Sequence, residues 1–333
     1  MSISPKRKAV ALFSGGLDSM LAIRILQEQG FEVEALNIRT IFDCCKVPAA
    51  QAATDLGVRV TVLSVGDDYL DVLRHPRHGY GKAFNPCVDC RGYMGRMARQ
   101  LMEEIGACVV ITGELLGQRP NSQKRPQLDI VAREAGLRGR LLRPLSAKLL
   151  PPTIPETEGL IDREKLYDFT GRSRKPLIEL AEELGIAEIP TPSPGCALTE
   201  KTFAPRVKDL LDRQPHASRW DFELLSTGRH FRCRAETKIT IGRDERENAM
   251  LQAFFRRRDA SVAALVEPDN FIGPVGLIVG CPDEEAIGLA GALLVRYTRQ
   301  CDPENAFVRV FTAEEEHVFQ ARLSEAVHRL ELL

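Results

Sequence analysis

Two short segments of the chain carry residue types suited to chemistry, and the first is SGGLDS at residues 14–19. It follows the apolar run 8–13 and precedes a stretch, 17–29, whose apolar residues recur at helical spacing. Glycines between a buried strand and a helix let backbone N–H groups at the helix N-terminus bind phosphate oxygens. The lysine of a Walker A loop is missing, because no Gly-Lys-Ser/Thr follows. A glycine turn with Asp18 and Ser19 capping the helix is the plain alternative. The complete SGGxDS pattern favours phosphate binding.

The second segment is NPCVDC at residues 85–90, which places Cys87 and Cys90 three positions apart in an expected loop before a helix. Such a CxxC pair suits half a zinc site, a redox pair or the ligands of an iron–sulfur cluster. The sequence offers no second CxxC and no HxxxH to complete a zinc site. Cys196, in SPGC at residues 193–196, is a third candidate. Three thiolates from two loops can bind three irons of a [4Fe-4S] cluster and leave the fourth open for sulfide.

The same three cysteines could instead form a persulfide relay, in which one thiol carries sulfur and another resolves it. A purely structural role is the third alternative, and we favour the cluster. Among the other cysteines, Cys108 lies in an apolar run and is expected in the core. Cys44 and Cys45 follow the second expected strand and are interpreted as surface or accessory thiols.

Strands and helices alternate through the first part of the chain. Apolar runs predict strands over 8–13, 31–38, 58–65 and 107–112, and helical periodicity predicts helices over 17–29, 47–56 and 92–105. This order predicts an α/β fold with a doubly wound, mostly parallel sheet. Two further helices are expected over 176–184 and 204–212.

A linker is expected over 212–220, after which the pattern restarts. Strands are predicted near 230–234, 238–241, 275–279 and 306–311, and helices over 244–257, over 284–297 and at the end of the chain. A chain of 333 residues exceeds what one core usually serves. We therefore predict two domains, an α/β domain over 1–214 and a smaller α+β domain over 217–333.

SGGLDS resembles the signature of the PP-loop ATP pyrophosphatases. In that superfamily the loop holds the β- and γ-phosphates of ATP while the α-phosphate is attacked, so the resemblance implies adenylation of a substrate and release of pyrophosphate. Carried over by position, the loop residues are Ser14, Gly15, Gly16, Asp18 and Ser19. The resemblance also implies adenosine contacts at Asn37, Ile38 and Gly113, and a role for Asp18 in holding Mg²⁺.

Five further blocks occur in order between residue 6 and about residue 212. They resemble the tRNA thiouridine synthase group of PP-loop enzymes, and more closely its shorter 4-thiouridine synthase-like members. The blocks are GYGKAFNPCVDC, TGELLGQRPNSQ, LLRPLSAKLLPPTIPE, GRSRK and GCALT. The sequence departs from the expected pattern at Arg91, where the group suggests His, and at residues 193–195, where a glycine-rich run is expected.

The charge and composition of the chain limit which kinds of partner it can bind. The net charge is −1, so steering toward nucleic acid must come from a local patch. Residues 119–148 carry eight Lys or Arg against two acidic residues, which suits a phosphodiester backbone. TKITIGRDERENAML, at residues 237–251, resembles the RNA-binding domain of NFACT-type proteins. A dimerisation domain (which would make the protein a homodimer) or a structural domain with a solvated basic face is the alternative for this part.

The sequence thus predicts a cytoplasmic, ATP-dependent tRNA sulfurtransferase. No window approaches 18 apolar residues, and the N-terminal apolar run is too short for a signal peptide. A uridine carbonyl oxygen would attack the α-phosphate of ATP, and sulfur from sulfide or a persulfide carrier would displace AMP at the base. The alternatives are a PP-loop enzyme that adenylates a small molecule and a non-catalytic, nucleotide-dependent RNA-binding factor.

Overall fold

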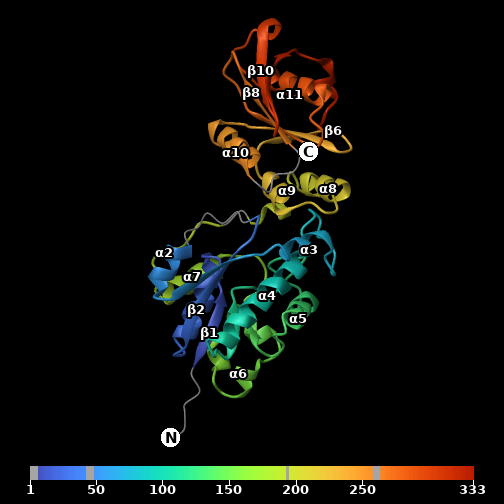
Figure 1. The fold of residues 1–333 in the computed structure, drawn as a ribbon. Helices are drawn as coiled ribbons and strands as arrows, with labels where there is room; N and C mark the ends of the chain where they lie inside the picture. The colour runs from blue at the N-terminus through green and yellow to red at the C-terminus, as the bar shows by residue number, and fades with distance from the viewer. Residues whose placement is uncertain (1–6, 43–48, 193–194, 258–262) are drawn as a thin grey trace. The chain divides into compact units, whose positions relative to one another are not determined.

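The computed structural model describes residues 7–42, 49–192, 195–257 and 263–333 (Figure 1). Cys44 and Cys45, which the sequence analysis singled out, lie outside the described residues. The chain divides into two compact units, Met1–Thr199 and Glu200–Leu333. Within the described part, no helix combines the length and the apolar character needed to cross a membrane.

The first unit contains a five-stranded parallel sheet with the order β3-β2-β1-β4-β5. The strands are β1 (Lys8–Leu12), β2 (Glu32–Arg39), β3 (Arg59–Ser64), β4 (Val109–Thr112) and β5 (Leu141–Leu142). β1 and β4 are buried along nearly their whole length, as expected for strands covered on both faces. The doubly wound, mostly parallel sheet predicted from the sequence is confirmed.

Helices cover both faces of this sheet (Figure 1). One group is α1 (Leu17–Gln27), α2 (Ala49–Leu56) and α7 (Lys175–Glu183), whose apolar residues share one core with β1 and β2. The other is α3 (Tyr69–Arg74), α4 (Cys87–Glu104) and α5 (Arg125–Glu134). α1 ends where Gly30 adopts a φ of +78°, a conformation that favours glycine after a helix.

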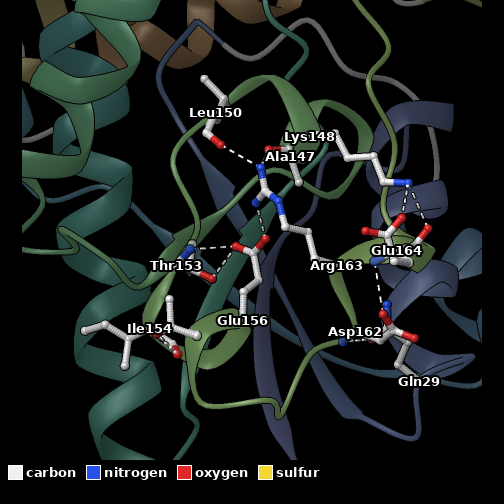
Figure 2. A network of polar contacts seen from close by, with 11 residues as sticks. Gln29, Ala147, Lys148, Leu150, Thr153, Ile154, Glu156, Asp162, Arg163 and Glu164 are labelled. Atoms are coloured by element: carbon white, nitrogen blue, oxygen red, sulfur yellow. Dashed lines mark hydrogen bonds and ion pairs between the residues drawn. The ribbon is translucent and has the colours of Figure 1, made fainter.

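The segment after β5 is fixed by a polar network (Figure 2). It contains the short helices η1 (Pro144–Leu149), α6 (Ile154–Thr157) and η2 (Arg163–Lys165). The Arg163 guanidinium donates to the Glu156 carboxylate and to the backbone carbonyls of Ala147 and Leu150. The Gln29 side chain accepts from the Asp162 N–H at 2.8 Å, which ties the segment to the end of α1.

The second unit is built on a seven-stranded antiparallel sheet with the order β11-β10-β8-β9-β7-β6-β12. Its strands are β6 (Arg229–Arg234), β7 (Thr237–Ile241), β8 (Ala263–Pro268), β9 (Gly276–Val279), β10 (Ala306–Phe311), β11 (Glu316–Ala321) and β12 (Glu331–Leu332). Its helices are α8 (Ala204–Arg213), α9 (Arg219–Leu224), α10 (Glu245–Arg256), α11 (Glu284–Arg296), η4 (Pro303–Asn305) and η5 (Glu325–Arg329).

Alternating strand residues supply two cores in this unit. Ala264 and Val266 of β8 pack with α11, whereas Leu265 between them packs with α9 and α10. α8 is held within the unit by a buried ion pair between its Asp209 and Arg232 of β6. The two faces of one sheet are therefore both covered by helices.

The predicted C-terminal helix is wrong. Residues 316–321 form β11, which pairs antiparallel with β10, and a 3₁₀ turn and the short β12 follow. Exposure alternates along β11, where Glu316 and Val318 are exposed and Ala321 is buried. Pairing with β10 decides the conformation of this segment, and the local sequence signal for it is weak.

Candidate active site

The PP-loop lies between β1 and α1. Gly15 has a φ of +76°, a conformation that favours glycine, and Gly16 is the N-cap residue of α1. Ser19 Oγ donates to the Gly16 carbonyl at 2.8 Å and lies 3.5 Å from Ser14 Oγ. Because the first N–H groups of a helix have no partner within it, this turn presents donors suited to an anion.

Two of the residues expected to contact adenosine have packing roles at this loop. Gly113 follows β4 directly, and a Cβ atom there would lie 2.4 Å from the backbone carbonyl of Asp18. The Asn37 side chain donates to the Phe13 carbonyl at 2.9 Å and thereby fixes the end of β1. Ile38 is buried, with 7% of its surface exposed. Adenosine contacts at these three positions remain a prediction.

Gln118 is a partner of the PP-loop that the sequence analysis missed. Its Nε2 donates to the Asp18 carboxylate at 2.8 Å, although the two residues are 100 positions apart. Gln118 belongs to the TGELLGQRPNSQ block, so the resemblance marked this segment without assigning the residue. The segment after β4 thus contacts the PP-loop through Gly113 and through Gln118.

The CxxC pair opens α4, one turn earlier than the helix predicted to begin at residue 92. Cys87 is the first residue of the helix, and Cys90 lies at the end of its first turn. The Asn85 side chain donates to Cys87 Sγ at 2.8 Å, and the Tyr69 hydroxyl lies 3.2 Å from Cys90 Sγ. Each sulfur atom of the pair therefore has a polar side-chain neighbour.

Cys196 lies near enough to Tyr69 and Arg91 for its charge to affect the pKa of both residues. Burial raises the pKa of Tyr69 well above its usual value, and the negative charges of Cys90, Cys196 and Cys87 add to this. We call Cys87, Cys90 and Cys196 the thiol cluster. In the part of the chain that the structure describes, no group of three or more His, Cys, Asp or Glu side chains is arranged to hold a metal ion.

An ion triad lies beside the thiol cluster. Glu114, with 5% of its surface exposed, accepts from Arg143 Nε at 3.2 Å and lies 3.6 Å from Arg91 Nε. Burial opposes ionisation of Glu114, but the charges of Arg143 and then Arg91 lower its pKa below the usual value. Burial also disfavours charged Arg91, yet Glu114 and the three thiols raise its pKa.

Arg143 shows that the basic segment 119–148 is not wholly a surface patch. Its side chain is 5% exposed, and its guanidinium donates to Glu114 and to the Leu128 carbonyl. The other seven basic residues of the segment are exposed, namely Arg119, Lys124, Arg125, Arg133, Arg138, Arg140 and Lys148. Three of these seven already pair with carboxylates, Arg133 with Glu134, Arg138 with Asp129 and Lys148 with Glu164.

Comparisons with known proteins agree with this arrangement. Residues 5–148 match the family model described as "Thiamine biosynthesis protein (ThiI)", and residues 228–328 match that of the "NFACT protein RNA binding domain". The chain is 24% identical over 234 residues to a "Probable tRNA sulfurtransferase" of Lysinibacillus sphaericus, an alignment covering 68% of this chain and 50% of that protein. It is 28% identical over 228 residues to a "tRNA-specific 2-thiouridylase MnmA" of Actinobacillus pleuropneumoniae, covering 63% and 55%.

The first unit is therefore similar to the PP-loop tRNA sulfurtransferases over residues 5–148. The second unit is similar to the NFACT RNA-binding domain over residues 228–328. The chain spans 50% and 55% of the length of these two curated relatives.

Proposed function

We propose that this protein is an ATP-dependent tRNA sulfurtransferase that adenylates a uridine carbonyl oxygen and then replaces it with sulfur. The observation that supports the proposal most is that the segment from Gly113 to Gln118 contacts both the PP-loop and Arg91. Gly113 and Gln118 contact the PP-loop, while Glu114 lies beside Arg91 at the thiol cluster. One segment of the chain thus connects the nucleotide loop with the region of the three cysteines.

The PP-loop residues suit the activation half of the reaction. A carbonyl oxygen is a poor leaving group, and its adenylate leaves readily as AMP. The N–H groups of Gly15, Gly16 and the first turn of α1 would bind the β- and γ-phosphates, with the Ser14 and Ser19 hydroxyls beside them. Asp18, oriented by Gln118, is the carboxylate we assign to Mg²⁺, which prefers oxygen ligands.

The thiol cluster suits the sulfur half of the reaction. Cys87 and Cys90 come from the first turn of α4, and Cys196 directly precedes η3 (Ala197–Thr199). The charges of all three raise the pKa of Tyr69 and of Arg91. Three thiolate donors agree in type and number with the ligands of a [4Fe-4S] cluster that has one open iron, although the described residues do not already bring them into a metal-ligating arrangement. Cys87, Cys90 and Cys196 would hold the cluster, whose open iron would supply a binding position for sulfide. A persulfide relay by the same three cysteines is the alternative. Its donor would be a persulfide carrier, which transfers sulfur already at the oxidation level of a persulfide, whereas sulfide would be a donor only for the cluster.

Transfer RNA is the substrate that the remaining features favour. The second unit would bind its backbone, as its NFACT-type match supports, and the exposed cations of residues 119–148 would add phosphate contacts. The matched relatives carry tRNA-modifying names, which supports the same substrate class.

Mass spectrometry of tRNA nucleosides tests the proposal. A strain lacking the gene should lose one thiolated uridine, and the purified protein should release pyrophosphate from ATP only when that tRNA is present. Pyrophosphate release with a small molecule and no RNA would favour a PP-loop enzyme of another substrate class. Failure to form pyrophosphate with any RNA would favour a non-catalytic binding factor.

Cysteine variants distinguish the cluster from the relay. Anaerobically purified protein should be brown and contain about four irons per chain. Cys87→Ala, Cys90→Ala and Cys196→Ala should each lose the iron, whereas Cys108→Ala should retain it. Colourless protein that thiolates RNA and needs Cys87 and Cys196 would support the relay.

A further inference from the structure

Two arginines of the second unit lie against one aromatic ring at the end of α11. Tyr297 directly follows the last residue of that helix and is partly buried. The guanidinium carbon of Arg229, from β6, lies 4.7 Å from the centre of the Tyr297 ring, and that of Arg296 lies 5.9 Å from it. At these distances cation–π attraction holds each guanidinium against the ring. We call Arg229, Arg296 and Tyr297 the tyrosine–arginine cluster.

The core of the second unit fixes the position of this cluster. Tyr297 packs against the core that α11 shares with the sheet, and its ring centre lies 6.1 Å from that of Phe231, which is 3% exposed. Arg229 and Phe231 are two positions apart on β6, so their side chains lie on the same face of the sheet. Arg296 also donates to the Val327 carbonyl at 3.3 Å, and Val327 is buried in the same core. Both guanidinium groups are therefore held by parts of the chain that are themselves fixed.

The charge of the tyrosine–arginine cluster is not neutralised within the described chain. Among the described residues, no Asp or Glu side chain forms an ion pair with Arg229 or Arg296. By contrast, Arg232 and Arg234 of the same strand each pair with an aspartate. A carboxylate that positions an arginine also cancels its charge, whereas an aromatic ring positions the arginine and leaves the charge in place. The cluster thus presents two positive charges to an external anion.

Further cations lie close to the tyrosine–arginine cluster along the chain. Arg299 follows Tyr297 by two residues, and Arg329 is the last residue of η5, whose Val327 accepts from Arg296. Arg299 and Arg329 are exposed, and in the described part of the chain neither forms an ion pair. The carboxyl end of α11 carries a partial charge of only about −0.5, so it stabilises these arginines and cancels little of their charge. Such a local excess of positive charge is typical of a nucleic-acid contact.

We infer that the tyrosine–arginine cluster is a contact of the second unit with the phosphodiester backbone of RNA. Guanidinium groups bind phosphate oxygens bidentately, and a base can stack on an aromatic ring or on a guanidinium plane. The match to the RNA-binding domain model, over residues 228–328, includes all three residues and favours RNA over an acidic protein. The inference rests on the proposed tRNA substrate, and it names the surface of the second unit that binds this RNA.

Binding of the full-length chain to bulk tRNA, measured over a range of KCl concentrations, tests the contact. Backbone contacts are independent of sequence, and each one lost lowers the slope of log affinity against log salt by roughly one. The double variant Arg229→Gln/Arg296→Gln should therefore have a slope lower by about two and bind at least roughly tenfold more weakly at about 0.1 M salt. Arg229→Lys/Arg296→Lys keeps both charges and should retain the wild-type slope.

A matched control removes two arginines that carboxylates already neutralise. Arg234 pairs with Asp283, and Arg309 of β10 pairs with Asp269. The variant Arg234→Gln/Arg309→Gln changes the net charge of the unit by the same amount and should leave the slope unchanged.

Two changes at the ring test how the arginines are held. Tyr297→Phe keeps the ring and should bind tRNA as the wild type does. Tyr297→Leu releases both guanidinium groups without removing their charge, so it should weaken binding by roughly threefold and keep the slope.

Wild-type affinity and slope in Arg229→Gln/Arg296→Gln, with an unchanged unfolding temperature, would overturn the inference. A loss of affinity with an unchanged slope would also overturn it, because the arginines would then act through the fold and not through phosphate contacts. If the double variant does not fold, the single variants Arg229→Gln and Arg296→Gln should each lower the slope by about one. The assay needs neither ATP nor sulfur transfer, so the contact is confirmed or refuted whether or not the proposed enzymatic activity is found.

Discussion

Replacing Gly113 with alanine tests whether the contact between β4 and the PP-loop controls catalysis. The new Cβ would lie 2.4 Å from the backbone C and O atoms of Asp18 and 2.5 Å from the backbone nitrogen of Ser19, whereas ordinary contacts begin at 3.4 Å. The clash is with backbone, so no side-chain rotation relieves it. The first turn of α1 must therefore move away from β4 by about 1 Å.

Two magnitudes follow from that displacement. Overpacking of this kind costs about 1–3 kcal/mol, which a domain with a stability of about 5–15 kcal/mol survives. A displacement of about 1 Å at a phosphate-binding loop lowers the rate on the order of 100-fold, because bound ATP no longer meets the attacking oxygen in line. Gly113→Ala should thus fold and still lose most of its turnover.

The assay is pyrophosphate release at varied ATP, with the unfolding temperature measured in parallel. Gly288→Ala in α11 is the matched control, since a Cβ there would meet nothing closer than the Phe319 ring at 3.9 Å. It should leave pyrophosphate release at the wild-type value and should not lower the unfolding temperature, because alanine favours a helix interior over glycine. Gly113→Ala with an unchanged kcat/KM for ATP would refute the assignment of this loop to the nucleotide.

Four further predictions concern separate parts of the molecule. Asp18→Ala should fold but release no pyrophosphate; normal turnover would remove the loop from the mechanism. Gln118→Ala should raise the Mg²⁺ concentration needed for half-maximal rate, because the Asp18 carboxylate loses its 2.8 Å donor; an unchanged Mg²⁺ requirement counts against that role. A chain ending at Thr199 should bind tRNA more weakly than the full chain, and its affinity should fall less steeply with salt concentration. An equal salt dependence for the two chains would show that the second unit does not contact the RNA backbone. Burial, and then Arg232, lower the pKa of Lys238 to about 8, so its cost to folding is full below pH 8 and disappears as pH rises toward the unfolded value of about 10.5. Lys238→Met should therefore melt at a higher temperature than wild type at pH 7, by a margin that narrows above pH 8.

Local periodicity was enough to predict most of the first unit. The helix over 17–29 and the strand over 31–38 are present as α1 and β2, because their apolar residues face one core. The two-residue strand β5 gives no periodic signal, and its conformation depends on pairing with β4. β11 was missed for the same reason, since its partner β10 imposes the extended conformation.

The chemistry of the site was less accessible from sequence. The glycines and the CxxC pair are local patterns, whereas Gln118 meets Asp18 across 100 residues and Tyr69 meets Cys90 across 21. Arg143 was counted with a basic surface because charge composition does not reveal burial. Only the fold shows whether an arginine is buried and bound to a carboxylate, as Arg143 is to Glu114, or exposed and able to bind a phosphate.

Sheet topology explains why the nucleotide loop and the thiol cluster share one segment. The strand order places β2 on one side of β1 and β4 on the other, so the order in which strands are added to the sheet reverses at β1 while all the strands remain parallel. The loops that leave two such strands separate at their carboxyl ends, where open α/β sheets bind ligands. Here the PP-loop leaves β1, and the Gly113–Gln118 segment leaves β4. Since a backbone contact at Gly113 and a side-chain bond at Gln118 both bind this segment to the PP-loop, Glu114 between them is held in a fixed place relative to the nucleotide loop. Glu114 in turn pairs with Arg91, the residue directly after Cys90, so this six-residue segment connects the PP-loop with the start of α4.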